Sequence, residues 1–163
     1  MLKFCHKEKI KLIATDFDGI LTDGGIYLSC TGNENFKKIN YKDIMGISTW
    51  LKSGRKFAII SGDSCEAIDF LAKKFNLEDT HQGLRFNQKD EVLKNIMNKY
   101  SLTEEEICYI GDDINDINAL KTAQTAITVP DANYKVKEIN GIIITESKGG
   151  YGAVREVVDS ILN

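Results

Sequence analysis

Three apolar runs that each end in polar residues limit most strongly how this chain can fold. The runs cover residues 10–14, 57–60 and 107–110. Their length and branched side chains are typical of buried β-strands. The polar segments that follow them are, in order, Asp16-Phe17-Asp18-Gly19, Ser61-Gly62-Asp63 and Gly111-Asp112-Asp113. We expect two further strands at residues 126–129 and 142–144.

Helical patterns alternate with these strands. They cover residues 43–53, 64–75, 88–99, 114–123, 133–138 and 151–162. Strands that alternate with helices favour a parallel sheet covered on both faces, so we expect an α/β fold with a Rossmann-like doubly wound sheet. Ligands bind at the carboxyl edge of such sheets, which is where the three polar segments should lie.

Residues 20–40 depart from this alternation. Two short strand-like pieces, residues 26–28 and 36–39, flank Thr31-Gly32-Asn33, which predicts a β-hairpin beside the aspartate segment. At 163 residues the default is a single domain. We therefore expect one domain over residues 1–163, with the hairpin inserted at about residues 20–40.

Charge and residue types disfavour several classes of protein. A net charge of −3 gives no reason to expect a nucleic-acid partner. Apolar runs of transmembrane length and a signal-peptide segment are both lacking, so we expect a cytoplasmic protein without a membrane partner. A zinc site or a Ser-His-Asp triad is also disfavoured, because the cysteines form no Cys-x-x-Cys pair and the histidines are isolated. These residues are Cys5, Cys30, Cys65, Cys108, His6 and His81.

Asp16 and Asp18 point most directly to chemistry. Two carboxylates this close at the end of a strand attract a hard cation such as Mg²⁺, which prefers oxygen ligands. One carboxylate can act as a nucleophile while the other transfers protons. Taken alone, the pair could also be a solvated acidic turn.

The ordered set of motifs resembles the haloacid dehalogenase superfamily of aspartate-nucleophile phosphatases. The set consists of Asp16-x-Asp18-Gly, Ser61-Gly62, Lys89 and Gly111-Asp112-Asp113. Two longer stretches narrow the resemblance to the 3-deoxy-D-manno-octulosonate 8-phosphate phosphatases, a family that includes phosphatases of nine-carbon keto-deoxy sugar acids. These stretches are residues 16–25 and the tail Gly149-Gly150-Tyr151-Gly152-Ala153-Val154-Arg155-Glu156.

This resemblance implies an architecture and an assembly. The insertions are too short for the cap domain that usually encloses the substrate in the superfamily, so a capless fold is expected. Known members are homotetramers in which hairpins assemble the centre and a neighbour's tail helps to close each active site. The phosphosugar acid substrate would connect the chain to lipopolysaccharide biosynthesis.

The resemblance also implies a role for each motif residue. Asp16 would be the nucleophile, and Asp18 would protonate the leaving oxygen and then activate water. Mg²⁺ would be held by Asp16, Asp18 through its backbone carbonyl, and Asp112. Ser61 and Gly62 would contact phosphate, and Lys89 would supply positive charge to phosphate or Asp16. Asp113 is a second candidate near the metal, with a partner of Lys89 or a helix N-terminal charge as the alternatives.

Departures from the family pattern, here and at Lys42, leave the substrate open. Two extra residues separate Gln82-Gly83 from Lys89, which makes Arg85 a second candidate for phosphate contact. Asp63 replaces the Arg that is usual in the octulosonate enzymes, and with Lys74, eleven positions later, it matches the nine-carbon phosphatases. A helix cap and a surface charge are the alternatives for this pair.

Lys42 and Asp43 align with a substrate-contact loop that carries Arg at the Lys42 position. Lys42 can still bind a carboxylate, but as a point charge. We therefore expect octulosonate 8-phosphate as the substrate, with a nine-carbon 9-phosphate as the alternative.

Three other classes of protein are alternatives, and one of them, a phosphotransferase or mutase, usually carries a cap domain. An inactive regulatory domain should have lost a catalytic carboxylate, whereas Asp16, Asp18 and Asp112 are all present. A response-regulator receiver carries its phospho-accepting aspartate after a middle strand, whereas here the Asp-x-Asp-Gly motif follows the first.

Overall fold

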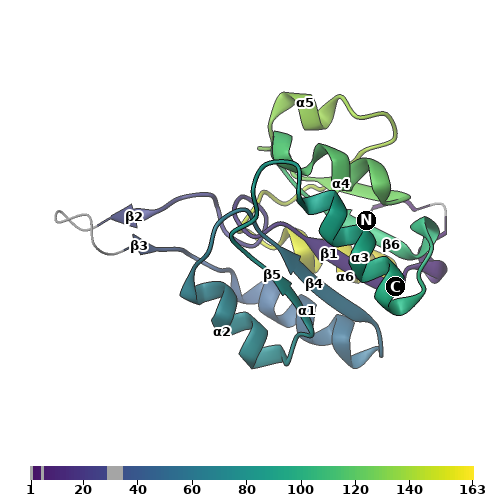
Figure 1. Cartoon of the computed structure of the whole chain (residues 1–163), viewed down its shortest axis with the longest axis horizontal. Coiled ribbons are helices and arrows are strands. Elements are labelled where there is room, and N and C mark those ends of the chain that lie inside the picture. The colour runs from purple at the N-terminus through teal and green to yellow at the C-terminus, as the bar shows by residue number, and fades with distance from the viewer. Residues whose placement is uncertain (1, 5, 29–34) are drawn as a thin grey trace.

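A parallel sheet of six strands, ordered β5-β4-β1-β6-β7-β8, forms the centre of the computed structural model (Figure 1). The structure describes residues 2–4, 6–28 and 35–163. The strands are β1 (Leu12–Thr15), β4 (Lys56–Ile60), β5 (Asp79–His81), β6 (Ile107–Ile110), β7 (Thr125–Thr128) and β8 (Ile143–Ile144). All five expected strands are present. Strand β5 was not expected, because its sequence Asp-Thr-His contains no apolar run.

Helices cover both faces of the sheet. On one face, α1 (Tyr41–Lys52), α2 (Glu66–Phe75) and α6 (Ala153–Leu162) pack in one apolar cluster with Ile13, Phe57 and Cys108. On the other, α3 (Lys89–Tyr100), α4 (Ile117–Thr122) and α5 (Tyr134–Lys137) pack with Leu12, Ala14 and Tyr109. Neighbouring residues of a strand thus enter opposite cores, which is why the strands are continuously apolar. The doubly wound α/β fold is confirmed.

The direction of winding reverses beside β1. From β1 the chain passes through α1 to β4 and through α2 to β5, and α3 then returns it across the sheet to β6. Such a switch point leaves a crevice at the carboxyl ends of the strands. Asp16, Ser61 and Asp112 follow the adjacent strands β1, β4 and β6, so the fold brings them to this crevice.

A two-stranded hairpin projects from the body of the molecule (Figure 1). It pairs β2 (Tyr27–Leu28) with β3 (Asn35–Phe36) in antiparallel fashion, and a bridge between Thr22 and Ile39 closes its base. The turn expected at residues 31–33 lies outside the described residues, as do Cys5 and Cys30. Apolar side chains that are more than half exposed lie on the hairpin: Ile26, Tyr27, Leu28 and Phe36.

Between β1 and α1 the described residues form only this hairpin and no cap domain. Short 3₁₀ turns connect other elements: η1 (Lys7–Lys9), η2 (Glu104–Glu106) and η3 (Ile114–Asp116). In the described ranges we find no helix with the length and apolar character that crossing a membrane requires.

Candidate active site

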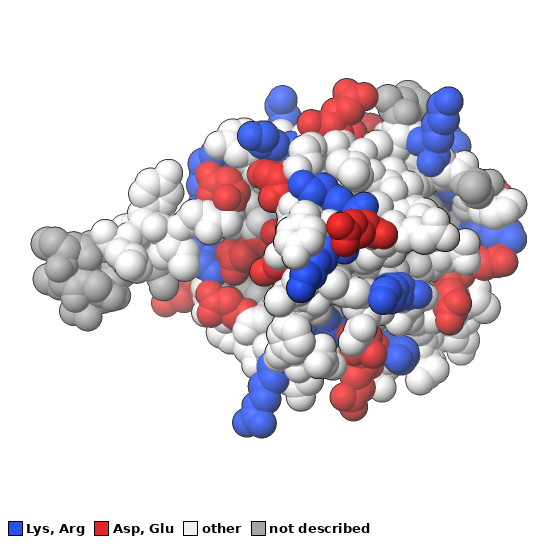
Figure 2. Space-filling view, turned by 90° about the horizontal axis from the view of Figure 1, so that it is seen from above, with Lys and Arg blue, Asp and Glu red and all other residues white. Residues whose placement is uncertain are grey.

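A hollow of about 290 Å³ lies at the carboxyl edge of the sheet. Acidic side chains gather where the hairpin joins the body of the molecule (Figure 2). The hollow is lined by Asp16, Asp18, Gly19, Gly24, Ser61, Gly62, Asp63, Asp112, Asp113 and Asn115. Five of these ten residues are aspartates, and none of the described residues that line it is a lysine or arginine. A phosphate dianion would therefore be repelled here unless a cation entered with it.

Asp16 is buried at the end of β1, with 6% of its surface exposed. Its Oδ1 atom accepts a hydrogen bond of 2.7 Å from the N–H of Phe17, and Oδ2 lies 2.8 Å from Nζ of Lys89. Burial and the nearby charge of Asp116 raise the pKa of Asp16 well above its ordinary value, although Lys89 opposes them.

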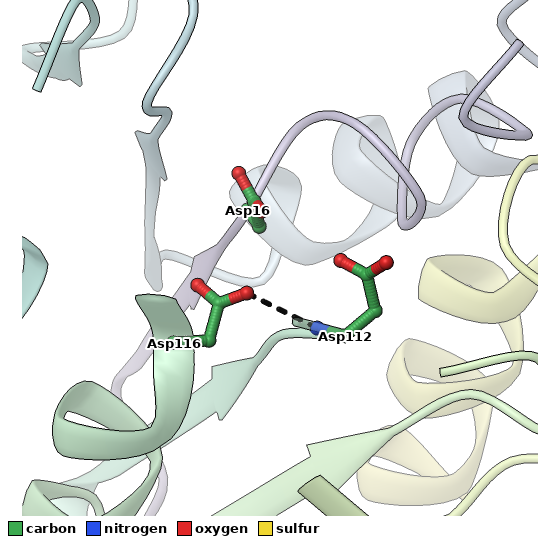
Figure 3. A group of neighbouring side chains, drawn as sticks. All are labelled: Asp16, Asp112 and Asp116. Carbon is green, nitrogen blue, oxygen red and sulfur yellow. Dashed lines mark hydrogen bonds between the residues drawn. The ribbon is translucent and has the colours of Figure 1, made fainter. Parts of the chain in front are cut away.

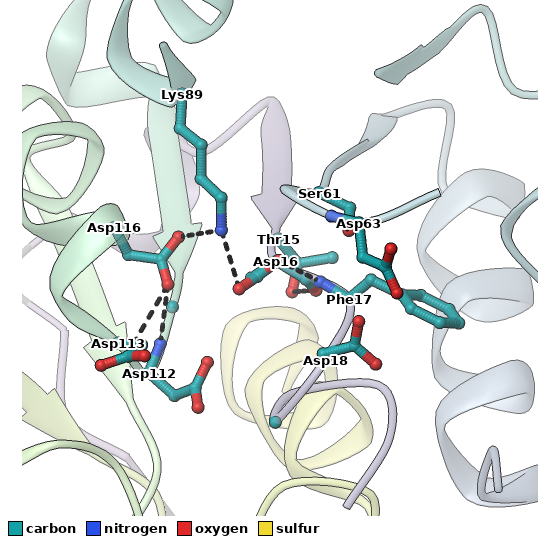
Figure 4. A network of polar contacts seen from close by, with 12 residues as sticks. Thr15, Asp16, Phe17, Asp18, Ser61, Asp63, Lys89, Asp112, Asp113 and Asp116 are labelled. Atoms are coloured by element: carbon teal, nitrogen blue, oxygen red, sulfur yellow. Dashed lines mark hydrogen bonds and ion pairs between the residues drawn. The ribbon is translucent and has the colours of Figure 1, made fainter. Parts of the chain in front are cut away.

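Lys89 points its ammonium group between two carboxylates (Figure 4). Its side chain is 2% exposed, and Nζ lies 2.8 Å from Asp16 and 2.8 Å from Oδ1 of Asp116. The two extra residues that precede Lys89 thus do not displace it from Asp16. Arg85, the other candidate, is exposed and does not line the hollow.

Asp116 is a site residue that the sequence analysis missed. Its Oδ1 atom accepts hydrogen bonds from Lys89 and from the buried hydroxyl of Tyr109, each at 2.8 Å. Its Oδ2 atom accepts from the backbone N–H groups of Asp112 and Asp113, each at 3.2 Å. Each Asp116 oxygen thus accepts two hydrogen bonds, and these bonds hold the Lys89 side chain and the loop after β6 in place. An Asp four positions after Asp112, within the first turn of a helix, is the signal that could have revealed it.

Asp112 has the free oxygen that a cation would need. Oxygens of Asp16, Asp112 and Asp116 lie within 4.8 Å of one another (Figure 3). The Oδ1 atom of Asp112 is buried and has no hydrogen-bond partner within the described part of the chain. Burial, reinforced by the charge of Asp116, raises the pKa of Asp112 to about 7. Because Asp116 is already engaged, Asp16 and Asp112 are the side chains best suited to hold a hard divalent cation.

Gly19 leaves room for the Asp112 carboxylate. A Cβ atom at Gly19 would lie 2.1 Å from Oδ2 of Asp112, and its φ angle of +76° is one that side chains disfavour. Gly149 and Gly150 of the tail motif pack against the same loop after β1. A Cβ at Gly149 would lie 1.7 Å from the Gly19 carbonyl oxygen, and Gly150 donates a hydrogen bond of 2.9 Å to the carbonyl of Ile20. The tail motif therefore shapes the aspartate loop of its own chain.

Asp18 is held by a residue of the hairpin. Its Oδ2 atom lies 2.7 Å from Nζ of Lys37, and its Oδ1 atom accepts a hydrogen bond of 3.2 Å from the hydroxyl of Thr22. Lys37 also lies 2.7 Å from Oδ2 of Asp63, and this contact lowers the pKa of Asp63. The sequence analysis did not single out Lys37, because only the fold brings the hairpin back to Asp18.

Ser61 and Gly62 lie in the hollow at the end of β4. The buried Ser61 hydroxyl accepts a hydrogen bond of 3.2 Å from the N–H of Asp63. A Cβ at Gly62 would meet Nδ2 of Asn115 at 3.5 Å. Asn115 also carries a buried Oδ1 atom without a hydrogen-bond partner in the described chain, and the sequence analysis did not anticipate this residue.

Asp113 caps the turn that follows β6. Its Oδ1 atom accepts hydrogen bonds of 2.8 Å from the N–H of Ile114 and 3.0 Å from the side-chain amide of Asn133. This arrangement corresponds to the helix N-terminal charge considered for Asp113, whereas Asp116 takes the place beside Lys89.

Asp43 does not lie in the hollow, in contrast to the expected substrate contact. It is fully buried, and its two oxygens accept hydrogen bonds from the N–H of Gly152 at 3.1 Å and of Arg155 at 3.0 Å. Burial raises the pKa of Asp43 to about 6. The correction has a physical reason: Asp43 joins α1 to the N-terminus of α6, so its carboxylate faces backbone N–H groups rather than a ligand.

Lys42 and Lys74 also lie outside the set of residues that line the hollow. Lys42 lines a separate hollow of about 590 Å³ together with Arg155. The ammonium group of Lys74 lies 5.8 Å from the ring of Phe70 and 6.0 Å from that of Phe75. The structure therefore pairs Asp63 with Lys37 rather than with Lys74. Asp63 is also not the N-cap of α2, a position that Cys65 occupies.

Comparison with known proteins identifies the family. Residues 84–156 match the haloacid dehalogenase-like hydrolases. The 3-deoxy-D-manno-octulosonate 8-phosphate phosphatase KdsC of Escherichia coli K12 is 31% identical over 155 residues, which cover 95% of this chain and 80% of that protein.

Solved structures agree with this match. The Moraxella catarrhalis octulosonate phosphatase, in complex with magnesium, phosphate and KDO, is 35% identical. Its TM-score is 0.88, with 96% of this chain and 87% of that chain covered. The cobalt-bound Haemophilus influenzae enzyme is 29% identical, with a TM-score of 0.86 and coverages of 96% and 89%. The resemblance expected from the motifs is thus confirmed. This chain belongs to the haloacid dehalogenase-like hydrolases, in the capless family of the 3-deoxy-D-manno-octulosonate 8-phosphate phosphatases, and is a phosphoric monoester hydrolase.

Proposed function

We propose that this chain hydrolyses the terminal phosphate of a keto-deoxy sugar acid, with 3-deoxy-D-manno-octulosonate 8-phosphate as the substrate. The observation that carries the proposal is the buried Asp16 carboxylate, held by Lys89 at the floor of a hollow lined by aspartates. Relatives that are 31% and 35% identical carry this substrate in their names, and one of them binds KDO.

In the proposed reaction, an Asp16 oxygen attacks phosphorus in line while the bond from phosphorus to the sugar oxygen breaks. Asp18 gives a proton to the leaving oxygen, which departs as the sugar alcohol. Asp18 then takes a proton from a water molecule that attacks the aspartyl phosphate, and this step releases phosphate and regenerates Asp16. Lys89 keeps Asp16 oriented throughout, and Asp116 keeps Lys89 in place.

Mg²⁺ is the cofactor that we propose for this site. The donor set is entirely oxygen, and the unpartnered Oδ1 atom of Asp112 lies beside Asp16. Asp16, Asp112 and the backbone carbonyl of Asp18 would hold the ion, as the family resemblance implies. When bound, Mg²⁺ supplies the positive charge that lets a phosphate enter among five aspartates.

The nine-carbon alternative is less well supported than the eight-carbon substrate. It rests on Asp63 acting together with Lys74, but Asp63 pairs with Lys37 and Lys74 lies against aromatic rings. A scaffold without activity is disfavoured because Asp16, Asp18 and Asp112 all line one hollow.

A substrate panel in Mg²⁺ tests the proposal. We expect kcat/KM for octulosonate 8-phosphate to exceed that for glucose 6-phosphate by at least about a hundredfold, roughly 2.7 kcal/mol of transition-state binding. A nine-carbon 9-phosphate should fall between the two. If glucose 6-phosphate reacted as well as either sugar acid, the sugar-acid assignment would be abandoned and only a general phosphatase would remain.

We further propose that the chain forms a homotetramer through its hairpin. Ile26, Tyr27, Leu28 and Phe36 expose apolar surface that solitary proteins usually bury, and among the described residues β2 and β3 pair only with each other, which leaves their outer edges open. Light scattering at micromolar concentration should give four times the mass of the chain, and Leu28→Lys should give smaller species. A monomer with intact activity would rule out this assembly.

A further inference from the structure

The ammonium group of Lys37 lies in an unusual position for a residue of a projecting hairpin. The residue follows β3 directly, yet its side chain is only 2% exposed. Nζ lies 2.7 Å from Asp18, 2.7 Å from Asp63 and 5.7 Å from the centre of the Phe17 ring. Its neighbour Lys38 has a side chain that is 43% exposed. The burial of Lys37 therefore reflects a specific site rather than the general packing of the hairpin.

Lys37 binds one of the two oxygens of the Asp18 carboxylate. The two Asp18 oxygens have different partners, the Thr22 hydroxyl for Oδ1 and Lys37 for Oδ2. Thr22 lies at the base of the hairpin, where it bridges to Ile39. Both restraints on Asp18 thus come from the hairpin or its base, and the Lys37 contact is charge-assisted and the shorter of the two.

Asp63 anchors Lys37 from the opposite side of the hollow. Its side chain is 57% exposed, and it lies in the loop between β4 and α2 rather than in the hairpin. The pair of contacts to Lys37 therefore connects the loops after β1 and β4 through one ammonium group. Holding Lys37 is therefore a role for Asp63 that does not require Asp63 to contact a substrate hydroxyl.

We propose that Lys37 is a positioning residue for proton transfer: anchored by Asp63, it orients the Asp18 carboxylate toward the leaving oxygen. The inference rests on the proposed function, in which Asp18 is the general acid. It adds that the hairpin, through one buried lysine, controls how well that acid works.

Substrates with different leaving groups can show whether Lys37 positions Asp18 or only supports the structure of the site. A sugar alkoxide needs a proton as it departs, whereas p-nitrophenolate is a stable anion and needs none. Misplacing Asp18 should therefore slow phosphoryl transfer to Asp16 from a sugar phosphate far more than from p-nitrophenyl phosphate, whereas the later attack of water on the aspartyl phosphate is common to both substrates. Loss of folding or of positive charge near phosphate would slow both reactions alike.

The experiment compares kcat/KM for octulosonate 8-phosphate and p-nitrophenyl phosphate in Mg²⁺, because kcat/KM reports only the steps up to departure of the leaving group and not the later attack of water that Asp18 also assists. For Lys37→Met we expect a loss of about thirtyfold or more with the sugar phosphate but less than about threefold with the aryl phosphate, since a general acid contributes about 10²–10⁴. Lys37→Arg should recover most of the activity. Asp63→Asn should show the same selectivity with a smaller loss, and it keeps the test possible if Lys37→Met does not fold.

Lys38→Met is the matched control, because Lys38 pairs with Asp23 outside the aspartate hollow and should behave like the wild type with both substrates. Equal losses with both substrates, or wild-type rates in Lys37→Met, would overturn the positioning role while leaving the proposed function intact. A wild-type protein that hydrolyses neither substrate would overturn the proposed function, and this inference with it.

Discussion

Replacing Asp16 by Asn should lower kcat at least about a thousandfold, which corresponds to roughly 4 kcal/mol of activation free energy. The amide keeps the shape of the side chain and can still accept a hydrogen bond from the N–H of Phe17. It lacks the negative charge that pairs with Lys89 and that the proposed attack on phosphorus requires. Phosphate release under saturating Mg²⁺ and substrate measures the effect.

Asp79→Asn provides the control for a buried aspartate. Asp79 begins β5 and is 6% exposed, like Asp16, but it pairs with Lys99 away from the hollow. This variant should lose stability and keep kcat. Wild-type turnover in Asp16→Asn would mean that Asp16 is not the nucleophile.

Blocking the cation site at Gly19 should abolish most of the activity without altering any acidic residue. A Cβ at Gly19 would lie 2.1 Å from Oδ2 of Asp112, so the carboxylate must leave its present position in the aspartate cluster. For Gly19→Ala we expect activity to fall at least about a hundredfold, roughly 2.7 kcal/mol of barrier. Titration with Mg²⁺ should show weakened binding, as should Asp112→Ala, and chelation of the wild type should abolish activity until Mg²⁺ is restored.

Gly54→Ala is the control for Gly19→Ala, because it introduces the same backbone strain without disturbing the Asp112 carboxylate. Gly54 has a similar φ angle, +82°, but a Cβ there would meet nothing within 4 Å. Both alanine variants should lose about 1–2 kcal/mol of stability from the left-handed conformation. Only Gly19→Ala should bind Mg²⁺ poorly, and full activity of the wild type in excess chelator would contradict the metal requirement.

The sequence predicted the site residues whose position depends on the local pattern of apolar and polar residues. Asp16, Ser61 and Asp112 each follow an apolar run, and parallel strands bring such positions to one edge. The expected pairing of Lys89 with Asp16 came from family resemblance, and the structure has this contact despite the two extra residues.

Residues whose role depends on contacts distant in sequence were not predictable in this way. Lys37 reaches Asp63 across 26 residues, and Asp43 reaches Gly152 across 109. Asp116 was hidden for another reason, because a third aspartate in a helix turn usually faces solvent. The eight-carbon substrate, the tetramer and the cytoplasmic location stay predictions, since they depend on partners and surroundings that a single chain does not contain.

Trapping the covalent intermediate tests the central claim most directly. Enzyme quenched with acid during turnover of octulosonate 8-phosphate in Mg²⁺ should retain phosphate on one carboxylate. Reduction with borohydride converts an aspartyl phosphate into homoserine, which peptide mass spectrometry can locate. We predict homoserine at position 16, and none in Asp16→Asn. Homoserine at another position, or none at all in an enzyme shown to be turning over, would contradict the aspartyl-phosphate mechanism.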